Sequence, residues 1–123
     1  MSVTQEIDIV LDEILEVEGV AGVITMDKHG SIISARMPSI YDYETLDIVS
    51  KKLTKTLINI RALGIAFDDI TFHYSEIRLI VKNLRRGFLV ILNLPTISVP
   101  LLNVATKSAC KKITGILSFS KKN

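Results

Sequence analysis

The sequence has 123 residues, a formal net charge of +2 and 48% hydrophobic residues. This length has room for one domain with a core of moderate size, so we expect a single domain over residues 1–123. Near-neutral charge gives no indication of a nucleic-acid partner, and the single cysteine, Cys110, excludes an intrachain disulfide. No uncharged apolar run reaches the roughly 18 residues of a membrane span, and residues 1–5 lack the basic start of a secretion signal. These features predict a cytoplasmic protein.

The first predicted element is a helix that begins after Ser2. Ser2 and Gln5 have the spacing of a capping box, in which two side chains bond the free N–H groups of the first turn. Apolar residues follow at helical spacing, and the helix is expected to end before Gly19.

A β-hairpin is predicted next, in the stretch GVAGVITMDKHGSIIS from Gly19 to Ser34. The β-branched run Val20 to Met26 and the run Ser31 to Ala35 read as its two strands. The intervening Asp-Lys-His-Gly is either a polar site or a turn. Gly30 stands where a hairpin needs a positive φ, which favours the turn.

The second helix is predicted from Asp42, a typical N-cap, to a stop at Gly64. The side chains expected to face the core recur at three and four residues: Leu46, Val49, Leu53, Leu57, Ile60 and Leu63. Those placed on the opposite face are Ile48, Lys51, Lys55, Ile58, Asn59 and Ala62. Two isoleucines on that outer face favour an interface with another molecule.

Three further strands and a helix complete the chain. The strands are expected at Ile70 to Tyr74, Ile77 to Val81 and Phe88 to Leu94, joined by short turns as an antiparallel meander. Pro95 closes the last strand, and Ser98 with Pro100 predicts a helix start. The side chains that this helix is expected to bury are Leu102, Ala105, Ala109, Ile113 and Ile116.

These elements predict an α/β fold built as an α+β sandwich. The continuous apolar runs Val20 to Met26 and Phe88 to Leu94 are typical of strands covered on both faces, so helices must lie on both sides of the sheet. Placing them at the centre gives one five-stranded antiparallel sheet, in the order 2-1-5-4-3 by position along the chain. The strand Ile70 to Tyr74 then lies at an edge that carries no proline or lysine, and such edges pair with other chains.

The sequence offers no catalytic or metal-binding motif, and we expect no enzyme activity and no cofactor. His29 and His73 have no cysteine or carboxylate at metal-ligand spacing. The adjacent Asp68 and Asp69 read as a solvated turn rather than an acid–base pair. Arg85 and Arg86, in a predicted hairpin turn, are either an anion-binding pair or two solvated side chains.

Charge is distributed unevenly between the first and last helices. The first carries six acidic residues and no basic one: Glu6, Asp8, Asp12, Glu13, Glu16 and Glu18. The last helix and tail carry only basic charges, on Lys107, Lys111, Lys112, Lys121 and Lys122. Side by side, the two helices would have complementary fields. The lysine tail is also compatible with contact to anionic lipid, although it is weaker than typical polybasic anchors.

The chain resembles the Roadblock family, which includes dynein roadblock light chains, Lamtor scaffold subunits and bacterial MglB regulators of Ras-like GTPases. The match rests on Gly-Val-x-Gly at Gly19 to Gly22, the turn glycine Gly30, the second helix and the apolar strand ending ILNLP. It spans essentially the whole chain. The full third helix after Pro100 is more similar to prokaryotic single-domain members than to dynein light chains.

The resemblance implies a homodimer in which the edge strand pairs antiparallel with its twin and the second helices pack side by side. The dimer-interface residues that it implies are Leu46, Ile48, Ile58, Ala62, Ile70, Thr71, Phe72, His73 and Tyr74. It also implies a Ras-like small GTPase partner, bound across the paired second helices at Ile48, Lys51, Lys55 and Asn59. Activation, nucleotide exchange and scaffolding all occur in the family. The alternative is a structural adaptor that joins a larger complex or a membrane surface.

Overall fold

The computed structural model describes residues 1–121 and has three helices and five strands in these residues. In chain order the elements are α1 (Val3–Leu15), β1 (Val20–Asp27), β2 (Ile32–Arg36), α2 (Tyr43–Ala62), β3 (Asp69–His73), β4 (Arg78–Leu84), β5 (Gly87–Asn93) and α3 (Val99–Lys121). The strands form one antiparallel sheet in the order β2-β1-β5-β4-β3. Both the element order and the strand order predicted from sequence are confirmed.

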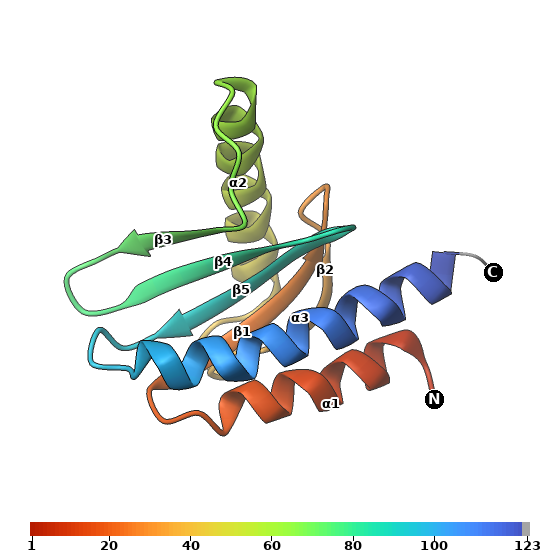
Figure 1. The fold of residues 1–123 in the computed structure, drawn as a ribbon, viewed down its shortest axis with the longest axis horizontal. Helices are drawn as coiled ribbons and strands as arrows, with labels where there is room; N and C mark the ends of the chain where they lie inside the picture. The colour runs from red at the N-terminus through yellow and green to blue at the C-terminus, as the bar shows by residue number, and fades with distance from the viewer. Residues whose placement is uncertain (122–123) are drawn as a thin grey trace.

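Helices cover the sheet on both faces (Figure 1). The side-by-side helices α1 and α3 lie against one face, where Leu11, Leu89 and Ile113 belong to one core cluster. A second cluster lies under α2 on the other face, with Leu57, Val81 and Phe88 among its members. All seven residues of β5 are buried, so the prediction of a central strand covered on both sides is correct.

The strand bounds differ from the predicted ones mainly at β4. The strand was expected to end at Val81 but continues to Leu84, because its ladder with β5 runs as far as the pair of Leu84 with Gly87. The connecting turn therefore contains only Arg85 and Arg86. The alternation of apolar and polar residues ends before the strand does, because the consecutive Lys82 and Asn83 of β4 are both polar.

The stretch after Gly19 is a hairpin whose corner is a turn. The Asp27 carboxylate accepts hydrogen bonds from the backbone N–H groups of His29, at 2.8 Å, and Ser31, at 3.0 Å. Gly30 has a φ of 87°, a conformation that favours glycine. Asp27 thus organises the chain reversal, and His29 is exposed. The corner has the architectural role that the sequence favoured.

The helix caps are also as predicted. Ser2 and Gln5 form both hydrogen bonds of a capping box at the start of α1. Asp42 caps α2 by accepting from the Thr45 N–H at 2.8 Å. This hydrogen bond lowers the pKa of Asp42, so the cap is complete well below neutral pH.

The core-facing side of α2 was partly mispredicted. The buried residues of α2 are Leu46, Ser50, Thr54 and Leu57, whereas Val49 is 49% exposed and Leu63 is 77% exposed. Small side chains are needed because the hairpin corner packs closely on the helix: a Cβ on Gly30 would lie 2.8 Å from the Thr54 hydroxyl. Thr54 satisfies its own hydroxyl by donating to the Ser50 carbonyl at 2.9 Å. Hydrophobic periodicity cannot detect a core position filled by a bonded hydroxyl.

Three acidic side chains of α1 form ion pairs, and only one of these pairs is with α3. Lys112 of α3 forms an ion pair with Glu13 at 3.0 Å. Asp8 and Asp12 instead contact Arg36 of β2, at 3.5 Å and 2.9 Å. The predicted complementarity between the two helices therefore rests on one ion pair among the described side chains, and exposed pairs of this kind add little stability.

Gly87 and Gly115 form a matched pair for testing the packing. Gly87→Ala should destabilise the fold by about 1–3 kcal/mol, because a Cβ would collide with the Met26 carbonyl of the adjacent strand. Gly115 is exposed within α3 and a Cβ there has open space, so Gly115→Ala should stabilise by about 0.5–1 kcal/mol. Urea unfolding measures both changes. Equal stability of the two variants would contradict the close β1–β5 contact.

Candidate functional site

The outer face of α2 is an exposed surface with apolar and basic side chains. Ile48 is 55% exposed and Ile58 is 51% exposed, and Lys55, Asn59 and Ala62 are exposed with them. The structure therefore leaves free the outer face that the helical periodicity predicted. Exposed isoleucines cost solvation free energy unless another molecule covers them.

The two lysines of this face differ in their surroundings. Lys51 contacts Asp47, one turn earlier, at 2.9 Å. This hydrogen-bonded pair raises the pKa of Lys51. Lys55 forms no ion pair with any side chain that the structure describes. Its ammonium group is consequently the freer of the two for an acidic partner.

Leu46 does not belong to this outer face. It is only 9% exposed and packs in the core cluster beneath α2. Its side chain is used within its own chain, and the contribution of Leu46 to a dimer interface stays a prediction. The residue lies at a core position of the helical repeat, so the periodicity itself assigned it to the inner face.

β3 is one of the two edge strands of the sheet and pairs with β4 alone. Ile70 and Phe72 are half-buried against the cluster beneath α2, while Thr71 and His73 are exposed on the opposite face. Tyr74 follows the strand and is 55% exposed. The five residues predicted for a dimer contact thus lie on one edge, with side chains divided between the two faces of the sheet.

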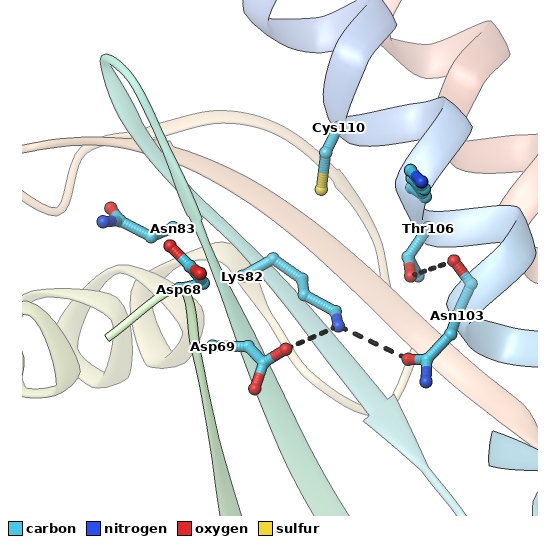
Figure 2. Close-up of a pocket in the computed structure, with 8 residues that line it drawn as sticks. Asp68, Asp69, Lys82, Asn83, Asn103, Thr106 and Cys110 are labelled. Atoms are coloured by element: carbon cyan, nitrogen blue, oxygen red, sulfur yellow. Dashed lines mark hydrogen bonds and ion pairs between the residues drawn. The ribbon is translucent and has the colours of Figure 1, made fainter. Parts of the chain in front are cut away.

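A polar crevice separates this edge from α3 (Figure 2). It has a volume of about 320 Å³ and is lined by residues of β3, β4 and α3. Lys82 extends across it from β4, with its Nζ 3.0 Å from the Asp69 carboxylate and 3.5 Å from Oδ1 of Asn103. Thr106 donates its hydroxyl to the Asn103 carbonyl at 3.3 Å. Sequence spacing did not indicate this crevice because its members come from three distant segments.

Asp68 and Asp69 have separate roles and do not form an acid–base pair. Asp69 binds Lys82, whereas the Asp68 backbone carbonyl accepts a hydrogen bond from the Asn83 N–H at 2.7 Å. The prediction of a simple solvated turn is incomplete, since Asp69 is the first residue of β3 and forms an ion pair. Both residues are exposed.

The thiol of Cys110 points from α3 toward the sheet in the same crevice (Figure 2). Burial raises the pKa of Cys110, and the nearby charge of Lys82 opposes this shift more weakly. The thiol is therefore protonated at neutral pH and is a weak nucleophile, because the thiolate is the reactive form. The crevice holds an ion pair and amide and hydroxyl groups, without an activated nucleophile.

An apolar cavity that sequence reasoning missed lies between α2 and the sheet. It has a volume of about 190 Å³, and its lining includes Tyr41, Val49, Leu53, Ile77 and Leu92. Val49 was assigned to the core by periodicity, and its half-exposed side chain instead forms part of the cavity rim. The departure of Val49 from the core stripe is visible only once the helix is packed.

The remaining charged candidates lie elsewhere. Arg85 is exposed in the β4–β5 turn, and Arg86 is half-buried, with an Nε that has no hydrogen-bond partner among the described residues. Of the predicted lysine tail, Lys121 ends α3 and Lys122 lies outside the described residues. Within residues 1–121, no cluster of His, Cys, Asp or Glu could hold a metal ion. The described helices include none that is both long and apolar enough to cross a membrane.

The shielding of Cys110 gives a measurable prediction. At pH 8 its alkylation by iodoacetamide should be several-fold slower than that of an exposed cysteine, and the rate should rise as pH approaches the raised pKa. The matched control is Ser108→Cys in a Cys110→Ser chain, because Ser108 is exposed on the same helix. Equal rates at the two positions would contradict the half-buried thiol.

Comparison with known proteins gives matches in structure and none in sequence. No family model and no curated protein matches the chain. Solved structures that match include MglB of Thermus thermophilus, described as a gliding protein, with a TM-score of 0.80 and 18% identity over 94% of this chain and 91% of that one. MglB of Myxococcus xanthus has a TM-score of 0.80 and 18% identity, over 94% of this chain and 90% of that one.

A third structural match carries the fold name. The Roadblock/LC7 domain from Streptomyces avermitilis has a TM-score of 0.75 and 14% identity, over 90% of this chain and 97% of that chain. Identities this low establish the arrangement of elements and leave the activity open. The chain has the Roadblock fold, with the α-β-β-α-β-β-β-α order and the five-stranded sheet of MglB and Roadblock/LC7 domains.

Proposed function

We propose that the protein is a non-catalytic, homodimeric regulator or scaffold for a Ras-like small GTPase. The observation that carries the proposal is the exposed outer face of α2, where Ile48 and Ile58 lie beside Lys55, which forms no ion pair with a described side chain. Structural similarity to MglB supports it at the level of fold. The GTPase would bind across the two α2 helices of the dimer, at Ile48, Lys51, Lys55 and Asn59.

The proposed dimer would cover two features that are exposed in a single chain, the edge of β3 and the outer face of α2. β3 presents unpaired backbone groups at the edge of the sheet, and pairing with a second copy would satisfy them. The same association would bring the apolar side chains of two α2 helices together. The exposed α2 residues of the proposed interface are Ile48, Ile58 and Ala62, beside the buried Leu46. The residues that the strand would contribute are Ile70, Thr71, Phe72, His73 and Tyr74.

The chemistry of the α2 face suits a regulator that works by binding. Its groups are aliphatic side chains, ammonium groups and the Asn59 amide, none of which is a general base or nucleophile. Such a surface would stimulate hydrolysis by ordering the catalytic groups of the GTPase itself, as the resemblance to MglB regulators implies. Arg85 and Arg86 lie in the β4–β5 turn, so we assign them no role as an arginine finger.

A structural adaptor without a GTPase is the second candidate. It is favoured by aliphatic side chains on the outer side of α3, where Leu101 is 66% exposed and Val104 is 72% exposed. An adaptor could use this surface for another subunit while keeping the same dimer. Binding titrations with GTPases separate the two candidates, because the adaptor predicts no nucleotide-dependent binding.

The dimer predicts a specific response to substitution on α2. Light scattering on the wild-type chain should give twice the monomer mass of 13.7 kDa. Ile58→Glu should shift the equilibrium toward monomer, because it places a charge in a desolvated contact. The control is Val104→Glu, which changes an even more exposed aliphatic residue on α3 and should leave the mass unchanged. A monomeric wild-type chain would overturn the proposed dimer.

The GTPase contact predicts an effect of charge reversal at Lys55. Lys55→Glu should weaken binding to a Ras-like GTPase carrying a non-hydrolysable GTP analogue by roughly tenfold, because a cation at the contact becomes an anion. Lys111→Glu, the same change on α3, is the control and should retain affinity. Titration calorimetry with GDP-loaded and analogue-loaded GTPases measures both. Unchanged affinity for Lys55→Glu would contradict this surface, and dimers that bind neither form would favour the adaptor.

A further inference from the structure

The hydrogen bonds of β3 determine which of its backbone groups face the free edge. The Asn83 N–H donates to the Asp68 carbonyl at 2.7 Å, and the Tyr74 N–H donates to the Ile77 carbonyl at 3.0 Å. In an antiparallel ladder, hydrogen-bonded pairs alternate with pairs that are not bonded. Residues 68, 70, 72 and 74 therefore bond toward β4. The outward N–H and C=O groups belong to Asp69, Thr71 and His73.

The side chains of β3 alternate between the two faces of the sheet with the same period as its inward and outward backbone groups. Ile70 and Phe72 pack against the cluster beneath α2, while Thr71 and His73 are on the opposite face. In a continuous sheet made from two copies, the apolar face of one β3 must continue into the apolar face of the other. Because strand side chains alternate with period two, a slip of one residue would break this match. Outward residues must therefore lie opposite outward residues.

Three registers satisfy both conditions with substantial overlap: Thr71 can lie opposite the partner's Asp69, the partner's Thr71 or the partner's His73. Only the middle one lets Asp69, Thr71 and His73 all find partners within the strand, and each such pair exchanges two hydrogen bonds. We propose that β3 pairs with its copy about a two-fold axis at Thr71, so that Asp69 lies opposite the partner's His73. This inference rests on the homodimer proposed above and specifies its geometry.

Charge complementarity favours the same register. Within one chain, Asp69 lies opposite Lys82 and binds it at 3.0 Å, and His73 lies opposite Arg78. Centring the pair on Thr71 joins these two pairs into one row of side chains across four strands. The row consists of Lys82, Asp69, the partner's His73 and the partner's Arg78. The Asp69 carboxylate then has a nitrogen-bearing side chain on each side. A slip of two residues would place opposite it the hydroxyl of the partner's Thr71 in one direction, or of the partner's Ser75, which lies beyond β3, in the other.

The register also changes the crevice beside β3. Asp69 lines that crevice together with Lys82 and Asn103 (Figure 2). The partner's His73, opposite Asp69, would stand at its outer end. The dimer therefore has two related crevices, each completed by a residue of the other copy.

Cysteine cross-linking tests the register. Cys110→Ser removes the only native thiol, and Thr71→Cys, Asp69→Cys and His73→Cys are each added to that background. The probe is dibromobimane, a short reagent that fluoresces after both its arms alkylate thiols. Thr71→Cys should give a covalent dimer in high yield, since facing Cβ atoms are about 5 Å apart. Asp69→Cys and His73→Cys should each give little alone, because identical positions would be about 13 Å apart along the strands.

Mixed dimers provide the matched control. Refolding Asp69→Cys with His73→Cys chains should restore efficient cross-linking, because the two thiols then face each other. The proposal is overturned if Thr71→Cys mixed with Asp69→Cys, or with His73→Cys, cross-links in higher yield than Thr71→Cys alone. That result would show that the register is shifted. If every combination fails while light scattering still gives a dimer, β3 pairing is wrong and the proposed dimer uses another surface. A monomeric wild-type chain would overturn both the proposed register and the proposed dimer.

Discussion

The structure depends on the burial of β5 on both faces. This strand is entirely buried and contains no charged residue, so it must be covered by apolar side chains above and below the sheet. The core cluster with α1 and α3 provides one cover, and the cluster beneath α2 provides the other. β1 and β4 flank it as ladder partners and carry the sheet outward toward its two edges.

The three-layer arrangement leaves the edge beyond β4 incompletely covered. α3 reaches β4, and the space between α3 and β3 is a polar crevice with Lys82 held across it by Asp69 and Asn103. The features that we associate with partners are accordingly at this side of the sheet and on the outer face of α2. A fold that buries its centre this completely concentrates its unsatisfied groups at an edge and on a helix face.

α2 shows how a helix can serve a core and an external surface together. Its inner side buries Leu46 and Leu57 together with Ser50 and Thr54. The small side chains of Ser50 and Thr54 permit close contact with the hairpin corner at Gly30, and the Thr54 hydroxyl donates to the Ser50 carbonyl. Its outer side keeps Ile48 and Ile58, which are larger and more hydrophobic than Ser50 and Thr54. This distribution is unfavourable for an isolated soluble helix. It becomes favourable if the outer side is covered by a second copy or a partner, as we propose.

The sequence by itself determined the order of the elements, the two central strands, the helix caps and the turn at Gly30, because local spacing and turn chemistry encode these features. It also indicated the exposed α2 face. Only the tertiary structure decided that Val49 borders a cavity, and that Asp69, Lys82 and Asn103 meet in one crevice. Such contacts join residues far apart in the chain, and helical periodicity locates a face only to within about one residue. The direction of the free backbone groups on β3 likewise required the observed hydrogen bonds, because either alternation is compatible with the same sequence.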